Sequence, residues 1–397
     1  MKKKITVGTT VVLILLAALL VFQLTYHFVG LQYQAKVDTL TKTQSDFSLL
    51  AEADPVIREN FFGELDDEKI EGGLIQGYVA SLDDPYSAYL TKEEYTRYQK
   101  EQEVLGSAIG VRLTYDAKRD RVVVYSVFSG SPAQTEGIQP GDVITSVDGK
   151  KTEDIGFYAV LEALTGDQGT KVDLTVRREI AMQVLDMNFT LTREKIKTNS
   201  VTYSVLEGNI GYVQIFAFDE SVRNELENTV NALVSAQVSG IVWDVRNTAG
   251  GDPLVALAVL DRLLPEGVMA KTVDHKGEKK ELHSDETCLD LPMTVLINSS
   301  TSFGGELFAA VLKDFGKATL IGETTHGKSL EQKVFELDNG SALLLSVMAY
   351  QPPKSPSFES VGVEPDISVK LSGENLYLLE HDNDPQLAEA RRVLSGN

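Results

Sequence analysis

The amino-acid sequence predicts a multidomain α/β protein that is preceded by one transmembrane helix. Three observations support this: an uncharged apolar run near the start, short glycine-separated strands over residues 106–178, and strands that alternate with helices from about 201 to 370. The 397 residues also exceed the roughly 100–200 residues of one domain. We expect a basic start with a membrane anchor (1–31), a stalk and helical region (32–103), a β-rich domain with short helices (104–180), an α/β core (181–375) and a C-terminal tail (376–397).

The expected anchor is the apolar run Ile5–Phe22, which follows the basic cluster Lys2–Lys4. Eighteen uncharged residues are the lower limit for spanning a bilayer, and the lysines keep the N-terminus inside. A cleaved signal peptide is the alternative. The apolar run continues to about Leu31 without a small-x-small cleavage site, which favours an uncleaved anchor. We therefore expect a single-pass protein of the cell membrane with an extracytoplasmic body.

Residues 48–103 have apolar side chains at a spacing near 3.6, which predicts helices. Asp84-Pro85-Tyr86-Ser87 is typical of a turn. A further helix is expected to begin at Thr91-Lys92-Glu93-Glu94, because acidic residues favour the first helical turn.

Residues 106–178 change to short strands separated by glycines. Val122–Val127 and Val172–Arg177 are the expected strands. Ser131 is placed to cap a short helix that starts with Pro132. Asp148-Gly149 predicts a hairpin turn.

The glycine pattern of this region resembles a PDZ domain, through Gly137, Pro140-Gly141-Asp142 and Val147-Asp148-Gly149 in that order. The resemblance implies that the domain binds protein or peptide C-termini, with the peptide added as a strand. The carboxylate would then meet backbone amides of the loop 106–111, and the candidate peptide-binding residues are Ala108, Ile109, Gly110 and Val111. A plain β-turn is the alternative for this loop.

The α/β core is predicted from four apolar runs and one amphipathic helix. The expected strands are Gly211–Phe218, Gly240–Val245, Thr294–Ile297 and Ala318–Ile321, and the second is almost wholly apolar and therefore buried. Residues 305–315 place their apolar side chains on one helical face.

Composition excludes several classes of function. The 37 Lys+Arg against 58 Asp+Glu give a net charge of −21, which argues against a nucleic-acid partner. The one cysteine, Cys288, forms no intrachain disulfide, and the five histidines lack the spacing of metal ligands. We expect neither a metal nor a cofactor.

Three motifs of the core resemble the carboxyl-terminal processing peptidases, also called tail-specific proteases: Asp244–Gly251, Val295–Leu307 and Gly322–Gln332. Three more landmarks in the family's order extend the resemblance over about residues 48–370: 84–89, 211–215 and 362–367. The resemblance implies an α/β serine–lysine peptidase-like core that cleaves proteins near their C-termini without metal or ATP.

The resemblance also implies roles for single residues. Lys328 would be the general base and Gln332 its support, while backbone amides at Gly250 and Gly251 would stabilise an oxyanion. Without the resemblance, Lys328 is read as a surface lysine. The glycine pair is then a tight turn that needs a positive φ.

The position that corresponds to the nucleophilic serine is Phe303, 25 residues before Lys328. Phenylalanine has no nucleophilic atom, and its ring would occupy the space of the scissile carbonyl. Ser302 is the candidate substitute, although consecutive side chains at a turn point in different directions. Lys328 could instead stay protonated over the Phe303 ring. His326 is read as polar surface.

Two further departures from the family pattern are Thr165, where an arginine is common, and Thr248-Ala249, in place of Asn-Pro.

Three hypotheses on the function remain open. The chain binds C-termini but is catalytically impaired, or it is an active serine endopeptidase that uses Ser302. In the third, it is a partner in a homo- or hetero-oligomer with an active relative.

Overall fold

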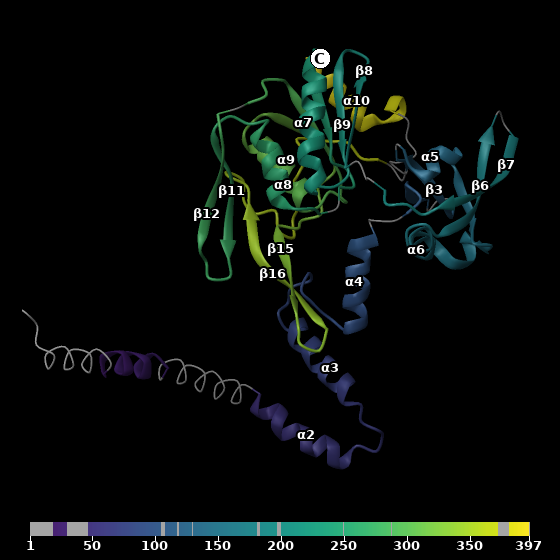
Figure 1. Ribbon diagram of the computed structural model, residues 1–397. Coiled ribbons are helices and arrows are strands. Elements are labelled where there is room, and N and C mark those ends of the chain that lie inside the picture. Colours follow the sequence, from purple (N-terminus) through teal and green to yellow (C-terminus); the bar gives the residue numbers. More distant parts are fainter. Residues whose placement is uncertain are drawn as a thin grey trace, which may run out of the picture. The chain divides into compact units, whose positions relative to one another are not determined.

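The computed structural model in Figure 1 describes residues 19–29, 47–104, 108–116, 119–128, 130–180, 183–196, 200–248, 250–286, 288–371 and 381–396. They fall into two units, divided between Ile75 and Gln76. Most of the expected anchor lies outside these ranges. Residues 19–29 are helical, and no helix within the described ranges is long and apolar enough to cross a membrane.

The first unit contains α2 (Ser48–Asn60) and the start of α3 (Asp67–Ala80), as the helical spacing predicts. Arg58 in α2 pairs with Asp54 one turn earlier and with Asp67 at the start of α3. Asp67 and Glu68 lie in the first turn of α3, where carboxylates favour the positive end of the helix dipole.

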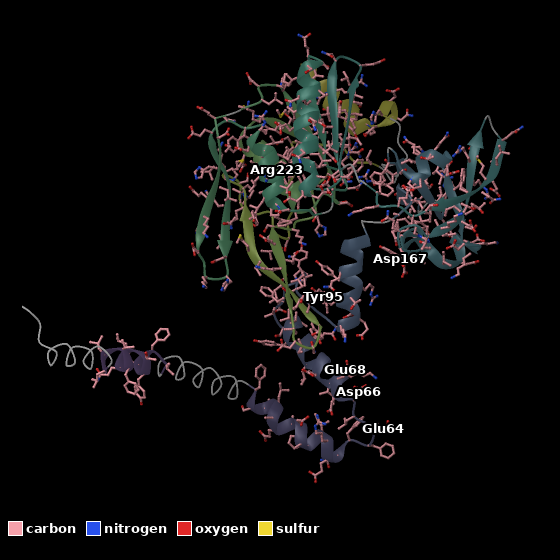
Figure 2. The ribbon with its side chains drawn as sticks, in the orientation of Figure 1. Glu64, Asp66, Glu68, Tyr95, Asp167 and Arg223 are labelled. Atoms are coloured by element: carbon pink, nitrogen blue, oxygen red, sulfur yellow. The ribbon has the colours of Figure 1, made fainter. Side chains whose placement is uncertain are left out.

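In the second unit, β1 (Ala88–Leu90) leads into α4 (Lys92–Val104). Thr91 and Glu94 form a reciprocal cap: the Glu94 amide donates to the Thr91 hydroxyl, and the Thr91 amide donates to the Glu94 carboxylate. The predicted helix start is therefore confirmed. Tyr95, marked in Figure 2, donates from its hydroxyl to Glu336 at 2.6 Å and fixes α4 to the strand that carries Glu336.

The β-rich domain is a sheet in the order β2–β3–β4–β6–β7, with α5 (Pro132–Glu136) and α6 (Thr152–Leu164). Ser131 caps α5 and Pro132 is its first residue, as expected. Asp148 and Gly149 both have positive φ in the turn between β4 and β5, which the Asp-Gly signal predicts. The strands are β2 (Val111–Asp116), β3 (Arg121–Val127), β4 (Val143–Val147), β5 (Lys150–Lys151), β6 (Lys171–Ile180) and β7 (Gln183–Thr192).

The expected domain boundary at residue 180 falls inside a hairpin. β7 pairs with β6 along its whole length, from Lys171 opposite Thr192 to Ile180 opposite Gln183. Glu194 then bridges back to Ala108. The β-rich domain therefore extends to about residue 194, because β7 is a strand of its sheet and not the start of the core.

The α/β core is a six-stranded sheet in the order β17–β14–β13–β10–β9–β8, parallel except for the β8–β9 pair. Figure 1 shows α7 (Glu220–Ser235), α8 (Pro253–Asp261) and α9 (Gly304–Asp314) grouped together. All three pack in one buried cluster with Ile241 and Trp243 of the sheet. The strands are β8 (Val201–Leu206), β9 (Ile210–Ile215), β10 (Gly240–Asp244), β13 (Met293–Ile297), β14 (Ala318–Gly322) and β17 (Ile367–Ser368).

The opposite face of this sheet is covered by α10 (Pro385–Leu394), in which Leu387 and Ala390 are buried against Val242 and Leu296. The segment expected to be a C-terminal tail thus contributes a core helix. Its buried side chains form a short apolar stripe that the sequence reading overlooked.

A second sheet in the core has the order β1–β16–β11–β12, with β15 paired to β16. Its remaining strands are β11 (Gly267–Asp274), β12 (Lys279–Ser284), β15 (Leu330–Glu336) and β16 (Ala342–Gln351). β1 and β15, the strand that follows Lys328, pair with the same residues Ala342–Leu344 of β16, on its two edges.

Candidate active site

The turn between β13 and α9 carries Phe303, with φ 45° and ψ −99°. A positive φ costs a bulky residue on the order of 1–3 kcal/mol and persists only where the surroundings enforce it. The Phe303 side chain is 6% exposed, and its ring packs edge-on against Tyr350 with 6.0 Å between centroids. A strained backbone thus occurs at the position that the resemblance assigns to the nucleophile.

The buried carboxylate of Glu306 fixes this turn. One of its oxygens accepts hydrogen bonds from the amides of Phe303 (3.0 Å) and Lys328 (2.8 Å). The other accepts from the Gly327 amide (2.6 Å) and the Thr325 hydroxyl (2.5 Å). Burial raises the pKa of Glu306, and these four donors oppose that rise.

Lys328 is half-buried between two aromatic rings. Its Nζ lies 4.9 Å from the ring centroid of Tyr86 and 5.8 Å from that of Phe303. The expected contact with Phe303 is confirmed, although Tyr86 is closer. Burial lowers the pKa of Lys328, while the negative charges of Glu359 and Asp84 act in the opposite direction. A lowered pKa suits an amine that serves as a base.

Glu359 also holds the start of the strand that follows Lys328. Its carboxylate accepts hydrogen bonds from the amide (2.6 Å) and the hydroxyl (2.9 Å) of Ser329. The Ser360 amide donates to the carbonyl of Gly327 at 2.8 Å, on the other side of Lys328. The backbone around Lys328 is therefore fixed from two directions.

Gln332 supports the site indirectly. Its amide nitrogen donates to the carbonyl of Leu330 (2.9 Å) and to the hydroxyl of Ser346 (3.1 Å). The Ser346 amide donates to Ser87, whose hydroxyl donates to Asp84 at 2.5 Å. Gln332 thus belongs to the network that positions Asp84, one of the two anions facing Lys328.

Ser302 takes part in the turn through its backbone. Its carbonyl accepts from the amides of Gly250 (3.3 Å) and Gly305 (3.1 Å), and its own amide donates to Thr248 at 2.9 Å. No hydrogen bond of its hydroxyl occurs among the described residues, and the ring contacts of Lys328 are with Tyr86 and Phe303. Lys328 thus contacts the Phe303 ring, and no hydrogen bond joins Lys328 to Ser302 within the described ranges.

The glycine pair, the candidate source of oxyanion-stabilising amides, adopts a left-handed backbone. Gly250 and Gly251 have φ of 74° and 94°. A Cβ on Gly251 would lie 2.8 Å from the backbone nitrogen and oxygen of Phe218, so only glycine fits there. The Gly250 amide is already directed to Ser302, while the Gly251 amide has no hydrogen bond within the described ranges.

Arg246, just before the glycine pair, anchors this turn to the C-terminal helix. Its guanidinium pairs with Asp244 (2.6 Å) and Asp384 (2.8 Å) and donates to Gln386 (2.9 Å). The Arg246 side chain is 2% exposed. Asp384 also caps α10 by accepting from the amides of Gln386 and Leu387.

Some groups of the candidate carboxylate-binding loop in the β-rich domain already have other partners. The Ala108 amide donates to the carbonyl of Glu194 at 3.0 Å, so it is already paired. The Ile109 side chain is fully buried. Gly110 has φ 84°, and a Cβ there would also strike Ser131, so only glycine fits. Val111 begins the edge strand β2.

Sequence reasoning missed four residues around Lys328: Glu306, Tyr86, Asp84 and Glu359. Glu306 carried a signal, since a glutamate three residues after a helix cap is typical of a capping box. The other three come from distant segments, and only the fold brings them together. Within the described ranges, no group of three or more His, Cys, Asp or Glu side chains is arranged to hold a metal.

Three segments of the chain match protein-family models. Residues 209–369 match peptidase family S41, residues 123–178 match the PDZ domain, and residues 22–94 match the N-terminal domain of the activating protease CtpB. The expectations of a PDZ domain and of a peptidase core are thereby confirmed.

Curated relatives agree with these matches. The chain is 28% identical over 361 residues to carboxy-terminal processing protease CtpA of Bacillus subtilis (strain 168), covering 90% of this chain and 76% of that protein. It is 29% identical over 339 residues to the "Probable CtpA-like serine protease" of Staphylococcus aureus (strain COL), covering 84% and 67%.

Two solved structures have the same architecture. The photosystem II D1 C-terminal processing protease matches with a TM-score of 0.50 and 28% identity over 75% of this chain and 81% of that one. An S41 protease structure from Bacteroides fragilis NCTC 9343 matches with a TM-score of 0.59 over 85% and 91%, and at 19% identity it supports the fold alone. The matches to peptidase family S41 and the PDZ domain, together with the similarity to the CtpA proteases, support a carboxyl-terminal processing peptidase family for this chain.

Proposed function

We propose that this protein is a membrane-anchored, extracytoplasmic member of the family that binds protein C-termini through its PDZ domain and is catalytically impaired. The observation that carries the proposal is the buried ring of Phe303 beside Lys328. Acyl transfer by a serine–lysine pair needs a hydroxyl at that turn, with the lysine as its base. A phenyl ring supplies no attacking atom and fills the space in which the scissile carbonyl would sit.

The remaining parts of a peptidase site support descent from an active enzyme. The strained φ of Phe303, the lowered pKa of Lys328 and the positive φ of the glycine pair are all features that catalysis would use. We infer that the loss concerns the nucleophile and its space, while binding of polypeptide ends is retained.

The second candidate is an active peptidase that uses Ser302 with Lys328 as base. The lowered pKa of Lys328 favours it, because a neutral amine is what a hydroxyl nucleophile needs. The contacts of Lys328 with Tyr86 and Phe303 count against it. The third hypothesis, in which the chain assembles with an active relative, agrees with a catalytically impaired chain. It predicts no further feature of the Lys328 site.

Activity and labelling assays decide between the candidates. An unfolded substrate with an apolar C-terminus is incubated with the unmodified chain, with Phe303→Ser and with Ser302→Ala, and each is treated with a fluorophosphonate probe. We expect neither cleavage nor labelling by the unmodified chain, and both for Phe303→Ser. Labelling of the unmodified chain that Ser302→Ala abolishes would establish the second candidate instead.

Cell fractionation tests the anchor. The proposal requires the chain to sediment with membranes, to keep its N-terminus and to lose its body to protease added outside the cell. The motivation is the run Ile5–Phe22 behind Lys2–Lys4. Recovery of a soluble form that lacks this run would show a cleaved signal peptide.

A further inference from the structure

Three aromatic side chains of the PDZ domain form one connected group, made of Tyr115 in β2 and Phe157 and Tyr158 in α6. The Phe157 ring lies 6.2 Å from Tyr115 and 5.6 Å from Tyr158, centroid to centroid. Tyr158 is 83% exposed and Tyr115 is 42% exposed. Gly156 breaks the helical backbone of α6 just before the two α6 rings, with φ 79° and ψ 166°.

The aromatic group lies at the end of β2 that is distant from the carboxylate loop. β2 is an edge strand of its sheet and pairs with β3 alone among the described strands. A peptide that adds to β2 in antiparallel orientation, with its carboxylate near Val111, places about one residue beside each residue of the strand. Tyr115 is four residues along from Val111, so it meets the side chain about four residues before the peptide's end.

The charges around this group favour a cationic side chain. The Tyr115 hydroxyl donates to the carboxylate of Asp120, which raises the pKa of Tyr115 and places negative charge beside its ring. Asp154 lies in the first turn of α6, next to Glu153, whose carboxylate pairs with Lys151 at 3.1 Å. Cations are attracted to aromatic faces, and a chain of net charge −21 attracts them at longer range.

The two nearby arginines do not cancel this preference. Arg119 and Arg121 both pair with the buried carboxylate of Asp116, at 3.3 and 3.0 Å. The carboxylate of Asp116 therefore partly neutralises the positive charge of both arginines.

We propose that the aromatic group binds an arginine or lysine side chain about four residues before the free C-terminus of a bound polypeptide. The inference rests on the proposed capture of C-termini by the PDZ domain and names the class of polypeptide that is captured. Peptides with an apolar last residue and a cation at this upstream position are the preferred ligands.

Fluorescence anisotropy with the full chain tests this preference. The probes are labelled eight-residue peptides that end in leucine, with arginine at the fourth position before the end or with citrulline, its neutral isostere, in the same place. We expect arginine to bind about two- to fivefold more tightly than citrulline, the range of an exposed cation–π contact. Moving arginine three residues further upstream should remove the difference.

Variants locate the effect. Tyr158→Leu should abolish the difference in affinity between the arginine and citrulline peptides. Tyr203→Leu removes an aromatic ring that is 49% exposed from β8 in the core; it is the control and should keep the difference.

The outcomes separate this inference from the proposed function. Amidation of the peptide's C-terminus removes the carboxylate, so equal binding of acid and amide peptides would overturn C-terminal capture and the inference with it. Carboxylate-dependent binding without a preference for arginine, or with a preference that survives Tyr158→Leu, would overturn the inference alone.

Discussion

Phe303 and Lys328 are held to a single oxygen of Glu306, which accepts the amide hydrogens of both residues at 3.0 and 2.8 Å. The separation between the backbones of these two residues is therefore set by hydrogen bonds of their amides. A change of side chain at 303 leaves these bonds intact, because the donor is the main-chain N–H. The proposed loss of the nucleophile would therefore leave this framework in place.

Replacing Glu306 with glutamine should break this framework. The glutamine side chain keeps one acceptor oxygen and turns an NH₂ group towards backbone N–H donors, so at least one buried donor loses its partner. We expect a loss of about 2–3 kcal/mol in the free energy of unfolding, measured by urea denaturation. Glu364→Gln is the control, since that side chain is exposed, and an equal loss there would contradict the special role of Glu306.

The regular elements of the core could be predicted from sequence because each carries a local signal. The apolar run Gly240–Val245 indicated a buried strand, and β10 is buried at every residue. The boundary at 180 and the supposed C-terminal tail differ from the structure for a physical reason. Pairing of β7 with β6 and docking of α10 on Val242 depend on partners that are distant in the sequence.

Only those residues of the candidate site that belong to a sequence motif could be predicted. Lys328, Gln332 and the glycine pair came from family resemblance, and the strained backbone of Phe303 left no trace in its sequence. Tyr86 lies 242 positions before Lys328 and contacts it only because β1 pairs with β16, next to β15. Pairwise contacts of this kind follow from topology and not from local pattern.

The pKa of Lys328 should fall further when an opposing anion is removed. Burial already lowers it from 10.5, and Glu359 counteracts the fall, so Glu359→Gln should lower it again. The titration can be followed by NMR of reductively ¹³C-methylated protein, with Lys328→Arg identifying the signal. Glu364→Gln should leave the titration unchanged. A higher pKa in Glu359→Gln would contradict the arrangement.

The lowered pKa of Lys328 also has a consequence for stability. Because the folded-state value lies below the unfolded value of 10.5, the unfolded chain binds more protons between the two pKa values. The contribution of Lys328 to stability therefore rises as the pH increases through that window. Lys328→Met should remove this rise, seen as a smaller gain in the urea midpoint between neutral pH and pH 10 than for the unmodified chain.

The link between Arg246 and α10 should be important for stability. Asp384→Asn removes one of the two carboxylates that neutralise a guanidinium buried to 2% exposure, while its side-chain oxygen can still cap the helix. Loss of one partner of a buried ion pair lowers the free energy of unfolding by about 3–5 kcal/mol. Because Asp244 still pairs with Arg246, we expect a loss of about 3 kcal/mol. Asp382→Asn, on the exposed preceding turn, should change the urea midpoint little.

A hydroxyl at position 303 should lower the free energy of unfolding and give the chain peptidase activity. Phe303→Ser removes a ring that is 6% exposed and packed on Tyr350, and truncation of a buried phenylalanine costs about 3–5 kcal/mol. The same cavity provides the space in which a scissile carbonyl can lie, next to Lys328 and the glycine pair. We expect a lower urea midpoint together with new cleavage of an unfolded substrate. Phe335→Ser, at a ring that is 41% exposed, should lose less stability and gain no activity.

The double variant Phe303→Ser/Lys328→Met identifies the base. If Lys328 deprotonates the new hydroxyl, the double variant should lose the cleavage gained by Phe303→Ser while its urea midpoint stays close to that of the single variant. The pH profile of Phe303→Ser adds a second readout, because activity should rise as Lys328 loses its proton and the midpoint of that rise should lie below 10.5. Cleavage that persists without Lys328 would assign the base to another group and leave the amine in contact with Tyr86 without a catalytic role.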